Sequence, residues 1–210
     1  MLPLETLLTF SAATAILCLS PGPSNLYIVA RTLASGPRHG IGAASGMAIG
    51  SMMYVLASAF GLAAVFVVFP MSFMVLKLCG ASYLVYLGIQ AFLQHKRNGL
   101  GKSEIKPASV ANIFKQSIWV ELTNPKTALF FLAFLPLFVD PTQGSVVTQL
   151  VLLGGIYCVI AFFSDLFMVF VSNLAGKWLA NSERFNRWQE RISGTILLSL
   201  GAIVFYDVSR

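Results

Sequence analysis

Three ionisable side chains lie in parts of the chain that are otherwise almost entirely apolar: Glu121, Lys126 and Asp165. An ionised side chain deep in a bilayer costs ~2.5–3.5 kcal/mol on insertion scales, so it needs a partner or a water-filled cavity. One interpretation is a buried ion pair, most simply between Lys126 and Asp165. The other is that all three line a substrate path, with Asp165 or Glu121 accepting a coupling proton. The two interpretations are compatible, and charge at membrane depth favours a functional role.

Proline motifs interrupt two hydrophobic stretches of the chain. One is Leu19–Asn25, in which Pro21 and Pro23 flank a glycine, and the other is Glu121–Lys126, which contains Asn-Pro-Lys. Because proline has no backbone N–H and its ring clashes with the preceding turn, a helix must kink or unwind at both places. In lipid, the backbone groups freed in this way are tolerated only inside protein or facing a watery cavity. Paired interruptions of this kind indicate a transporter site near the middle of the membrane.

The two helix breaks offer groups that suit a zwitterion. Exposed N–H groups at a half-helix N-terminus attract a carboxylate, and freed carbonyls at a half-helix C-terminus attract a cation. This chemistry fits an amino acid. The predicted substrate-binding residues lie in and beside the motifs: Ser20, Pro21, Gly22, Pro23, Asn25, Asn124, Pro125 and Lys126. The predicted ion-coupling residues are Asp165 and Glu121.

The composition is that of an integral membrane protein. Of the 210 residues, 57% are hydrophobic and 10% are charged, whereas a soluble domain carries about 25% charged residues. Stretches poor in charge predict an all-α fold with six transmembrane helices, each long enough to cross a bilayer. The predicted spans are residues 7–34, 40–69, 71–93, 113–139, 146–175 and 190–207.

One polar linker of appreciable length divides the chain near its midpoint. It covers about residues 94–112 and separates a first group of three spans, about 1–93, from a second, about 113–210. Three spans followed by a copy of themselves enter the membrane in opposite orientations. Pro21 and Pro125 are separated by 104 positions, close to half the chain. We therefore expect one transmembrane domain, residues 1–210, built from two inverted three-helix repeats in which the first and fourth helices are broken.

The distribution of basic residues predicts the orientation. The net charge is +6, and the basic side chains gather in alternate connections, including Arg31 and Arg38, Lys96 to Lys115, and Lys177 to Arg191. Positively charged loops stay cytoplasmic, so both termini are expected outside. The basic charge thus reflects membrane topology, and a nucleic-acid partner is not expected. The first apolar run has no preceding basic residue, so it is expected to be a retained span and not a signal peptide.

Sequence signatures of enzymes are missing. The two histidines, His39 and His95, lie in predicted cytoplasmic loops, so no metal or haem site at membrane depth is expected. Ser20 and Ser24 have no histidine at that depth to activate them. We expect no cofactor and no enzymatic activity. Gly42, Gly46 and Gly50 give one helix a smooth face for close packing, which permits a homodimer without requiring one.

A series of motifs runs in order along nearly the whole chain: Ser20-Pro21-Gly22-Pro23, Gly36 with Gly40, the Gly46–Gly50 region, Lys77 to Gly88, Asn124 to Ala128, Phe134 to Val139, and Asp165. In these motifs the chain resembles the LysE-type translocator family, in its branch of homoserine, threonine and homoserine-lactone exporters.

This resemblance implies a bacterial inner-membrane exporter of amino acids or their derivatives, driven by an ion gradient, with protons as the expected coupling ion. It also implies that the regions around Pro21–Pro23 and Asn124–Lys126 form the central site. Uncharged residues are usual in the family at the position of Glu121. A carboxylate there would favour basic or diamino substrates.

Two other functions stay open. Export of a metal cation is one, although histidines and clustered carboxylates are scarce. The second is a non-transporting membrane subunit of a larger complex, in which Asp165 and Lys126 would serve assembly alone.

Overall fold

The computed structural model describes residues 2–20, 22–62 and 108–179, together with the single residues 78, 82, 85, 86, 89, 195, 198 and 202. Within these residues every regular element is a helix, so the expectation of an all-α protein is confirmed for this part of the chain. Apart from these single residues, the predicted spans 71–93 and 190–207 lie outside the described part, as do most of the predicted linker and Pro21.

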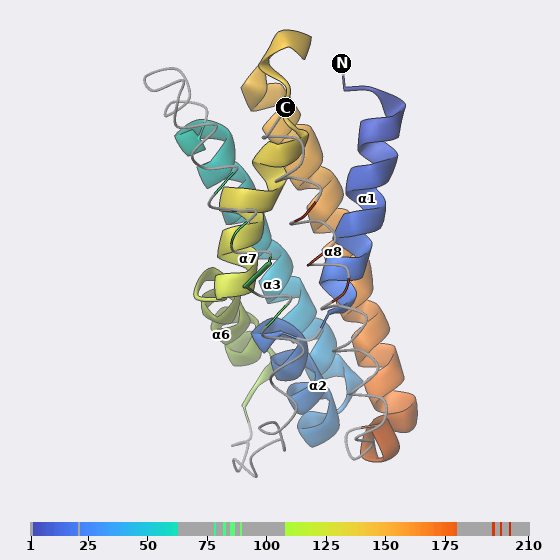
Figure 1. Cartoon of the computed structure of the whole chain (residues 1–210). Coiled ribbons are helices and arrows are strands. Elements are labelled where there is room, and N and C mark those ends of the chain that lie inside the picture. Colours follow the sequence, from blue (N-terminus) through green and yellow to red (C-terminus); the bar gives the residue numbers. More distant parts are fainter. Residues whose placement is uncertain are drawn as a thin grey trace.

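The first expected span is present as a bent pair of helices (Figure 1). Helix α1 covers Leu4–Leu19 and α2 covers Pro23–Ser35, and their axes differ by 52°. Gly36 has a φ of +88°, a conformation that side chains with a Cβ seldom adopt, and it turns the chain into α3 (Pro37–Ala57). A π-helical turn, η1 (Ser58–Leu62), prolongs α3.

The second interruption is also a real break. Two residues, Thr123 and Asn124, separate the end of helix α6 (Val110–Leu122) from the start of α7 (Pro125–Leu129). The chain continues as a π-helix, η2 (Phe130–Phe134), and then as two 3-10 turns, η3 (Leu135–Phe138) and η4 (Pro141–Gln143). The long helix α8 (Val146–Leu179) follows.

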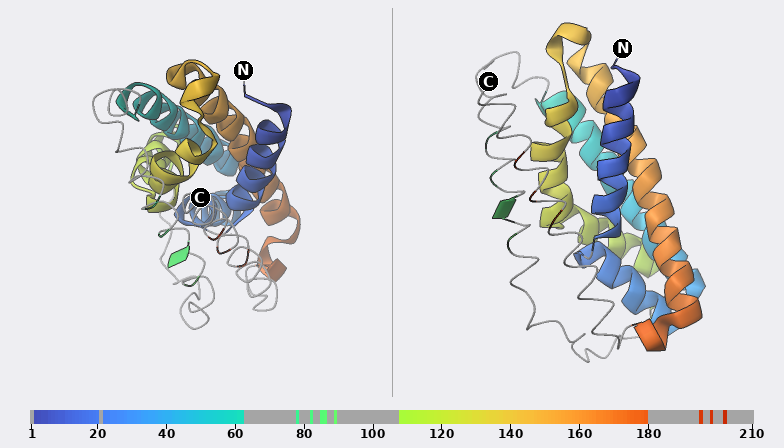
Figure 2. Two further views of the ribbon diagram at one scale, coloured as in Figure 1. Left: turned by 45° about the horizontal axis from the view of Figure 1, so that its top comes forward. Right: turned by 45° about the vertical axis from the view of Figure 1, so that its right-hand side comes forward.

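The two interrupted units run in opposite directions (Figures 1 and 2). The chain passes from the N-terminus through α1 and α2 toward one end of the bundle, and from α6 through α7 and η2 toward the other. Helix α8 starts at the same end as α1, and the two lie side by side. Helix α3 packs against both α6 and α8.

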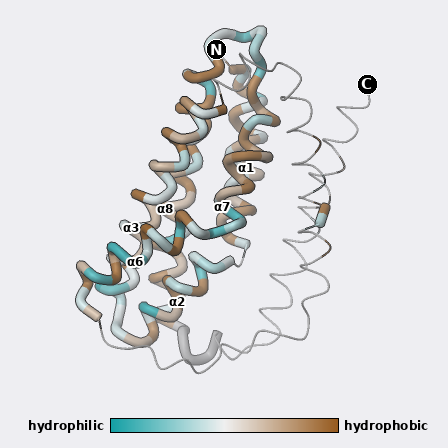
Figure 3. Tube along the Cα trace, turned by 90° about the vertical axis from the view of Figure 1, so that its left-hand side faces the viewer, coloured by the Kyte–Doolittle hydropathy of each residue, from teal (hydrophilic) through white to brown (hydrophobic). Residues whose placement is uncertain are grey.

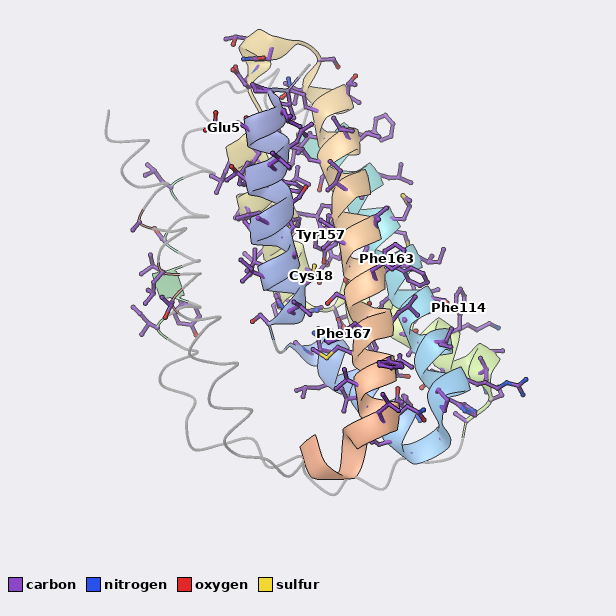
Figure 4. The ribbon with its side chains drawn as sticks, turned by 90° about the vertical axis from the view of Figure 1, so that its right-hand side faces the viewer. Glu5, Cys18, Phe114, Tyr157, Phe163 and Phe167 are labelled. Carbon is purple, nitrogen blue, oxygen red and sulfur yellow. The ribbon has the colours of Figure 1, made fainter. Side chains whose placement is uncertain are left out.

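Apolar length and apolar surface show that the bundle belongs in a membrane. Among the described residues, Pro37–Leu62 and Val146–Leu174 are long and apolar enough to cross a bilayer, and the bent α1–α2 pair is a third candidate. Apolar residues predominate along α1, α3 and α8, whereas polar residues mark the turns at the ends (Figure 3). Large side chains on α8 face outward, with Phe163 and Phe167 66% and 55% exposed (Figure 4). Water would penalise such a surface and lipid does not.

Aromatic rings fill the interior beyond the second break. The ring of Phe130 lies 4.2 Å from that of Tyr157 on α8 and 6.0 Å from that of Phe10 on α1, centroid to centroid. Phe131 stacks on Tyr54 of α3 at 5.5 Å with an interplanar angle of 10°. The segment that follows the break is therefore held on three sides by rings from α1, α3 and α8.

Glycines let α3 and α6 approach to backbone contact. A Cβ atom on Gly46 would meet the carbonyl of Phe114 and the hydroxyl of Ser117, and one on Gly50 would lie 2.8 Å from the Cβ of Glu121. These positions face α6, so the glycine-rich face predicted from sequence packs inside the bundle. Close helix approach through small residues is the usual packing device where the surrounding solvent is itself apolar.

Gly46→Ala tests this packing. The added methyl group meets a main-chain carbonyl that cannot move cheaply, and overpacking of this kind costs roughly 1–3 kcal/mol. We expect the detergent-solubilised variant to melt several degrees below wild type in a fluorescence-detected gel-filtration assay.

Gly155→Ala on α8 is the matched control, because its added Cβ would meet nothing within 4 Å. Its melting temperature should equal or exceed that of wild type. Equal melting temperatures for both variants would contradict the close packing of α3 on α6.

Candidate functional site

The first break leaves the last carbonyls of α1 without helical partners, and side chains satisfy two of them. Asn25 Nδ2 donates to the Cys18 carbonyl at 2.9 Å, and Lys126 Nζ donates to the Ser20 carbonyl at 2.6 Å. Helix α2 then begins at Pro23, whose missing N–H costs nothing at a first helical position. The freed carbonyls of the first break are thus bonded in part by Asn25, from the helix that follows the break, and in part by Lys126, more than 100 positions away.

The second break is closed by a different set of groups. Asn124 caps α7, since its Oδ1 accepts from the Lys126 backbone N–H at 3.0 Å. The Tyr54 hydroxyl of α3 donates to the Leu122 carbonyl at 2.6 Å. Pro125 is the first residue of α7, as Pro23 is of α2.

Side chains join the two breaks directly. Asn124 Nδ2 donates to Ser24 Oγ at 2.7 Å, alongside the contact of Lys126 with Ser20. Gly22 makes room for the lysine, because a Cβ there would lie 3.1 Å from Lys126 Cδ. The motifs that the sequence separates by half the chain therefore form one structural unit.

Glu121 lies at the centre of a cluster of hydroxyl groups. Its carboxylate accepts hydrogen bonds from Ser24 Oγ of α2, from Ser51 Oγ of α3 at 2.9 Å and from Thr127 Oγ1 of α7 at 3.0 Å. Glu121 is only 4% exposed. A buried carboxylate needs such donors, because burial without a partner would cost several kcal/mol.

A cavity of about 50 Å³ lies where the breaks meet. This exceeds the ~10–15 Å³ that one water molecule needs. One part of its lining is polar or ionisable and the other is apolar. The described polar lining residues are Ser24, Asn25, Glu121, Asn124, Lys126, Thr127, Tyr157 and Asp165, with Cys18 beside them. The described apolar ones are Leu17, Leu129, Phe130, Ala133, Phe134 and Ala161. Cys18 and Tyr157 lie in the region between α1 and α8 (Figure 4).

The three ionisable residues singled out in the sequence all line this cavity. Asp165 comes from α8, Glu121 from α6 and Lys126 from α7. Of the two interpretations of the sequence, the ion pair between Lys126 and Asp165 is not present among the described contacts. In the described part of the chain, the hydrogen bond of Lys126 Nζ goes to the Ser20 carbonyl instead.

The remaining predicted residues divide between lining and support. Asn25 and Asn124 line the cavity and bond to the breaks. Ser20 and Gly22 contribute a carbonyl and space for the lysine. Pro23 and Pro125 are exposed helix starts, outside the described cavity lining. Pro21 lies outside the described residues.

Sequence reasoning missed the hydroxyls. Ser24 directly follows Pro23 and Thr127 lies two positions beyond Pro125, so the proline motifs were a usable signal for both. Ser51 lies 70 positions from Glu121 and carries no local signal. No group of three or more His, Cys, Asp or Glu side chains among the described residues is arranged to bind a metal ion.

The family model described as LysE type translocator matches residues 15–208. Uncharacterized membrane protein YrhP of Bacillus subtilis is 28% identical over 94% of this chain and 97% of its own length. Two proteins named leucine efflux protein are 26% identical (Klebsiella pneumoniae; 93% of this chain, 92% of the relative) and 25% identical (Enterobacter sp.; 92% of each). No solved structure matches the chain. The protein belongs to the LysE type translocator family.

Proposed function

We propose that this protein exports small neutral amino acids from the cytoplasm in exchange for protons. The observation that carries the proposal is the cavity at the meeting of the two helix breaks. There one cationic side chain, Lys126, and two carboxylates, Glu121 and Asp165, share a lining with apolar side chains. A zwitterion with a hydrocarbon side chain complements such a surface, because each of its parts finds a partner of matching polarity.

The positive part of the lining suits the substrate carboxylate. Lys126 Nζ carries three N–H donors, and its bond to the Ser20 carbonyl uses one of them. Charge-assisted hydrogen bonds to a carboxylate are stronger than neutral ones. We therefore assign carboxylate recognition to Lys126.

The apolar part of the lining favours an aliphatic side chain. Leu17, Leu129 and Ala133 offer hydrocarbon surface, and Phe130 and Phe134 add aromatic faces. Burial of a leucine-sized side chain contributes about 1.5–3 kcal/mol. Two relatives carry the name leucine efflux protein, which agrees with a leucine-like substrate.

We assign the exchanged proton to Asp165. If Lys126 and Glu121 are both ionised, their charges cancel and Asp165 remains the uncompensated carboxylate among the described lining residues. A proton would neutralise it at membrane depth, and its uptake and release would couple substrate movement to the proton gradient. Glu121 is less suited to this task because three hydroxyl donors already hold its carboxylate.

Alternating access through two inverted repeats would move the substrate. The opposite directions of the α1–α2 and α6–α7 units support such repeats (Figures 1 and 2). Helices α3 and α6 begin at the same end of the bundle (Figure 1), where Gly42 lies against Val110. Arg38 is the second residue of α3 and Lys115 the sixth of α6. By the positive-inside rule this end faces the cytoplasm, which places the N-terminus outside the inner membrane.

Amino-acid release from loaded cells tests the function. Cells that lack their own exporters would be loaded with leucine-containing or other dipeptides, and external amino acids would be measured over time. We expect faster release of an aliphatic amino acid with the protein than with an empty vector. Release at the vector rate for all amino acids, from protein shown to be in the membrane, would refute the proposed function.

Asp165→Asn tests the coupling. We expect the variant to lose the acceleration of efflux by an inward proton gradient in proteoliposomes, because asparagine cannot take up and release a proton. Asp140→Asn is the matched control, since Asp140 caps η4 at the end of the bundle, away from the cavity. Proton-driven efflux that survives in Asp165→Asn at the wild-type rate would remove Asp165 from the coupling mechanism.

A further inference from the structure

We propose that Glu121, Ser24 and Thr127 form the subsite for the substrate's ammonium group, with Ser51 as a positioning residue. The proposal rests on the proposed function, because it specifies how the same cavity reads the amino group of its substrate. It also gives Glu121 a task separate from proton coupling. The argument starts from the hydrogen atoms of three hydroxyl groups.

Each hydroxyl has one hydrogen to donate and two lone pairs that accept. Ser24, Ser51 and Thr127 each direct that hydrogen to the Glu121 carboxylate. Once those hydrogens are committed, the hydroxyl oxygens can act toward any other group only as acceptors. By accepting these three hydrogen bonds, Glu121 leaves the three hydroxyl oxygens able only to accept from other groups. Its carboxylate also adds a negative charge next to them.

Two of these hydroxyl residues and Glu121 itself line the cavity. Ser24 Oγ also accepts from Asn124 Nδ2, which leaves one of its two lone pairs. Thr127 Oγ1 donates to Glu121 and also shares a side-chain hydrogen bond with the Tyr157 hydroxyl, which leaves one of its two lone pairs. An ammonium group has three N–H donors and no acceptor, so this set of oxygens matches it. An uncharged hydroxyl group in the same place would gain less from the carboxylate.

Ser51 and Gly50 hold Glu121 in place from α3. Ser51 is 2% exposed, lies outside the described cavity lining, and donates to the Glu121 carboxylate from behind. Gly50 lets the glutamate approach, since a Cβ at this position would lie 2.8 Å from Glu121 Cβ. The glycine face of α3 therefore positions the subsite as well as packing the helices.

The subsite and Lys126 divide the recognition of a zwitterion between them. Lys126 lies in α7, directly after the Asn124 cap, and its side chain reaches the first break. Glu121 lies in α6, before that cap. Both parts depend on the same junction of breaks. A substrate that lacks the amino group would leave the free lone pairs of Ser24 and Thr127 without a donor, and the negative charge of Glu121 without a cationic partner. Both effects disfavour binding.

The test compares leucine with 2-hydroxy-4-methylpentanoate, which replaces the amino group of leucine by a hydroxyl. Wild-type protein, Glu121→Gln and Thr127→Val would be reconstituted in proteoliposomes, and inhibition of labelled leucine exchange by each compound measured. Glutamine places an N–H donor where the carboxylate lay, so a hydroxyl must turn to accept from it. We expect the preference for leucine to fall by about tenfold or more in Glu121→Gln, and to a smaller extent in Thr127→Val.

Thr123→Val is the matched control. Thr123 is exposed, and its hydroxyl bonds to the Trp119 and Val120 carbonyls of its own helix. This variant should keep the wild-type preference. Gel filtration and melting curves would identify folded variants, and Thr127→Val decides the matter if Glu121→Gln does not fold.

Four results would overturn the proposal. If both folded variants kept the wild-type preference for leucine over the hydroxy acid, these residues would not form the ammonium subsite, even if leucine exchange continued. Leucine exchange in wild type could instead depend on sodium. If Glu121→Gln abolished that dependence and left the preference for leucine over the hydroxy acid unchanged, the cluster would be a sodium site. Loss of proton-driven exchange in Glu121→Gln at an unchanged preference would make Glu121 a proton carrier. Wild-type protein that exchanges no amino acid would refute the proposed function, and the subsite with it.

Discussion

Backbone groups freed inside a membrane must find partners within the protein, because the hydrocarbon offers none. This constraint organises the described part of the molecule. Each break exposes carbonyls, and side chains from the same break, from the other break and from α3 bond to three of them, those of Cys18, Ser20 and Leu122. The hydrogen bond from Lys126 to the Ser20 carbonyl is the most telling instance, because a cation at the centre of one motif completes the other.

The same constraint explains why a binding site arises here. Breaks concentrate polar groups that cannot be removed, and Gly22 and Gly50 let Lys126 and Glu121 approach them closely. Aromatic packing beyond the second break then supplies a hydrocarbon wall. A cavity with a cationic, an anionic and an apolar part follows from these local needs, and it suits an amphipathic zwitterion.

Much of this could be predicted from sequence, for reasons that lie in the chemistry of single residues. Proline cannot continue a helix, so the breaks at Pro23 and Pro125 followed directly. Ionisable residues in apolar runs pointed to Glu121, Lys126 and Asp165, and the structure brings them to one cavity. The partners of these residues could not be predicted. Lys126 bonds to the Ser20 carbonyl, a main-chain group that no sequence pattern marks, and not to Asp165, the partner that the sequence offered as one alternative.

The hydroxyl cluster shows the limit most clearly. Serine and threonine are common in membrane helices, and only the approach of α3 to α6 distinguishes Ser51 from any other serine. The π-helical turns at η1 and η2 likewise leave no pattern in apolar sequence. Contacts that form only through tertiary packing leave no pattern in the local sequence, and the site of this protein consists largely of such contacts.

A structure of the protein with a bound aliphatic amino acid, determined by cryo-electron microscopy in lipid, would test the central claim most directly. The account predicts substrate density between the two breaks, with its carboxylate on Lys126 and its side chain against Leu129 and Phe130. Density at another place, or a Lys126 that keeps to Ser20 without touching the ligand, would contradict it.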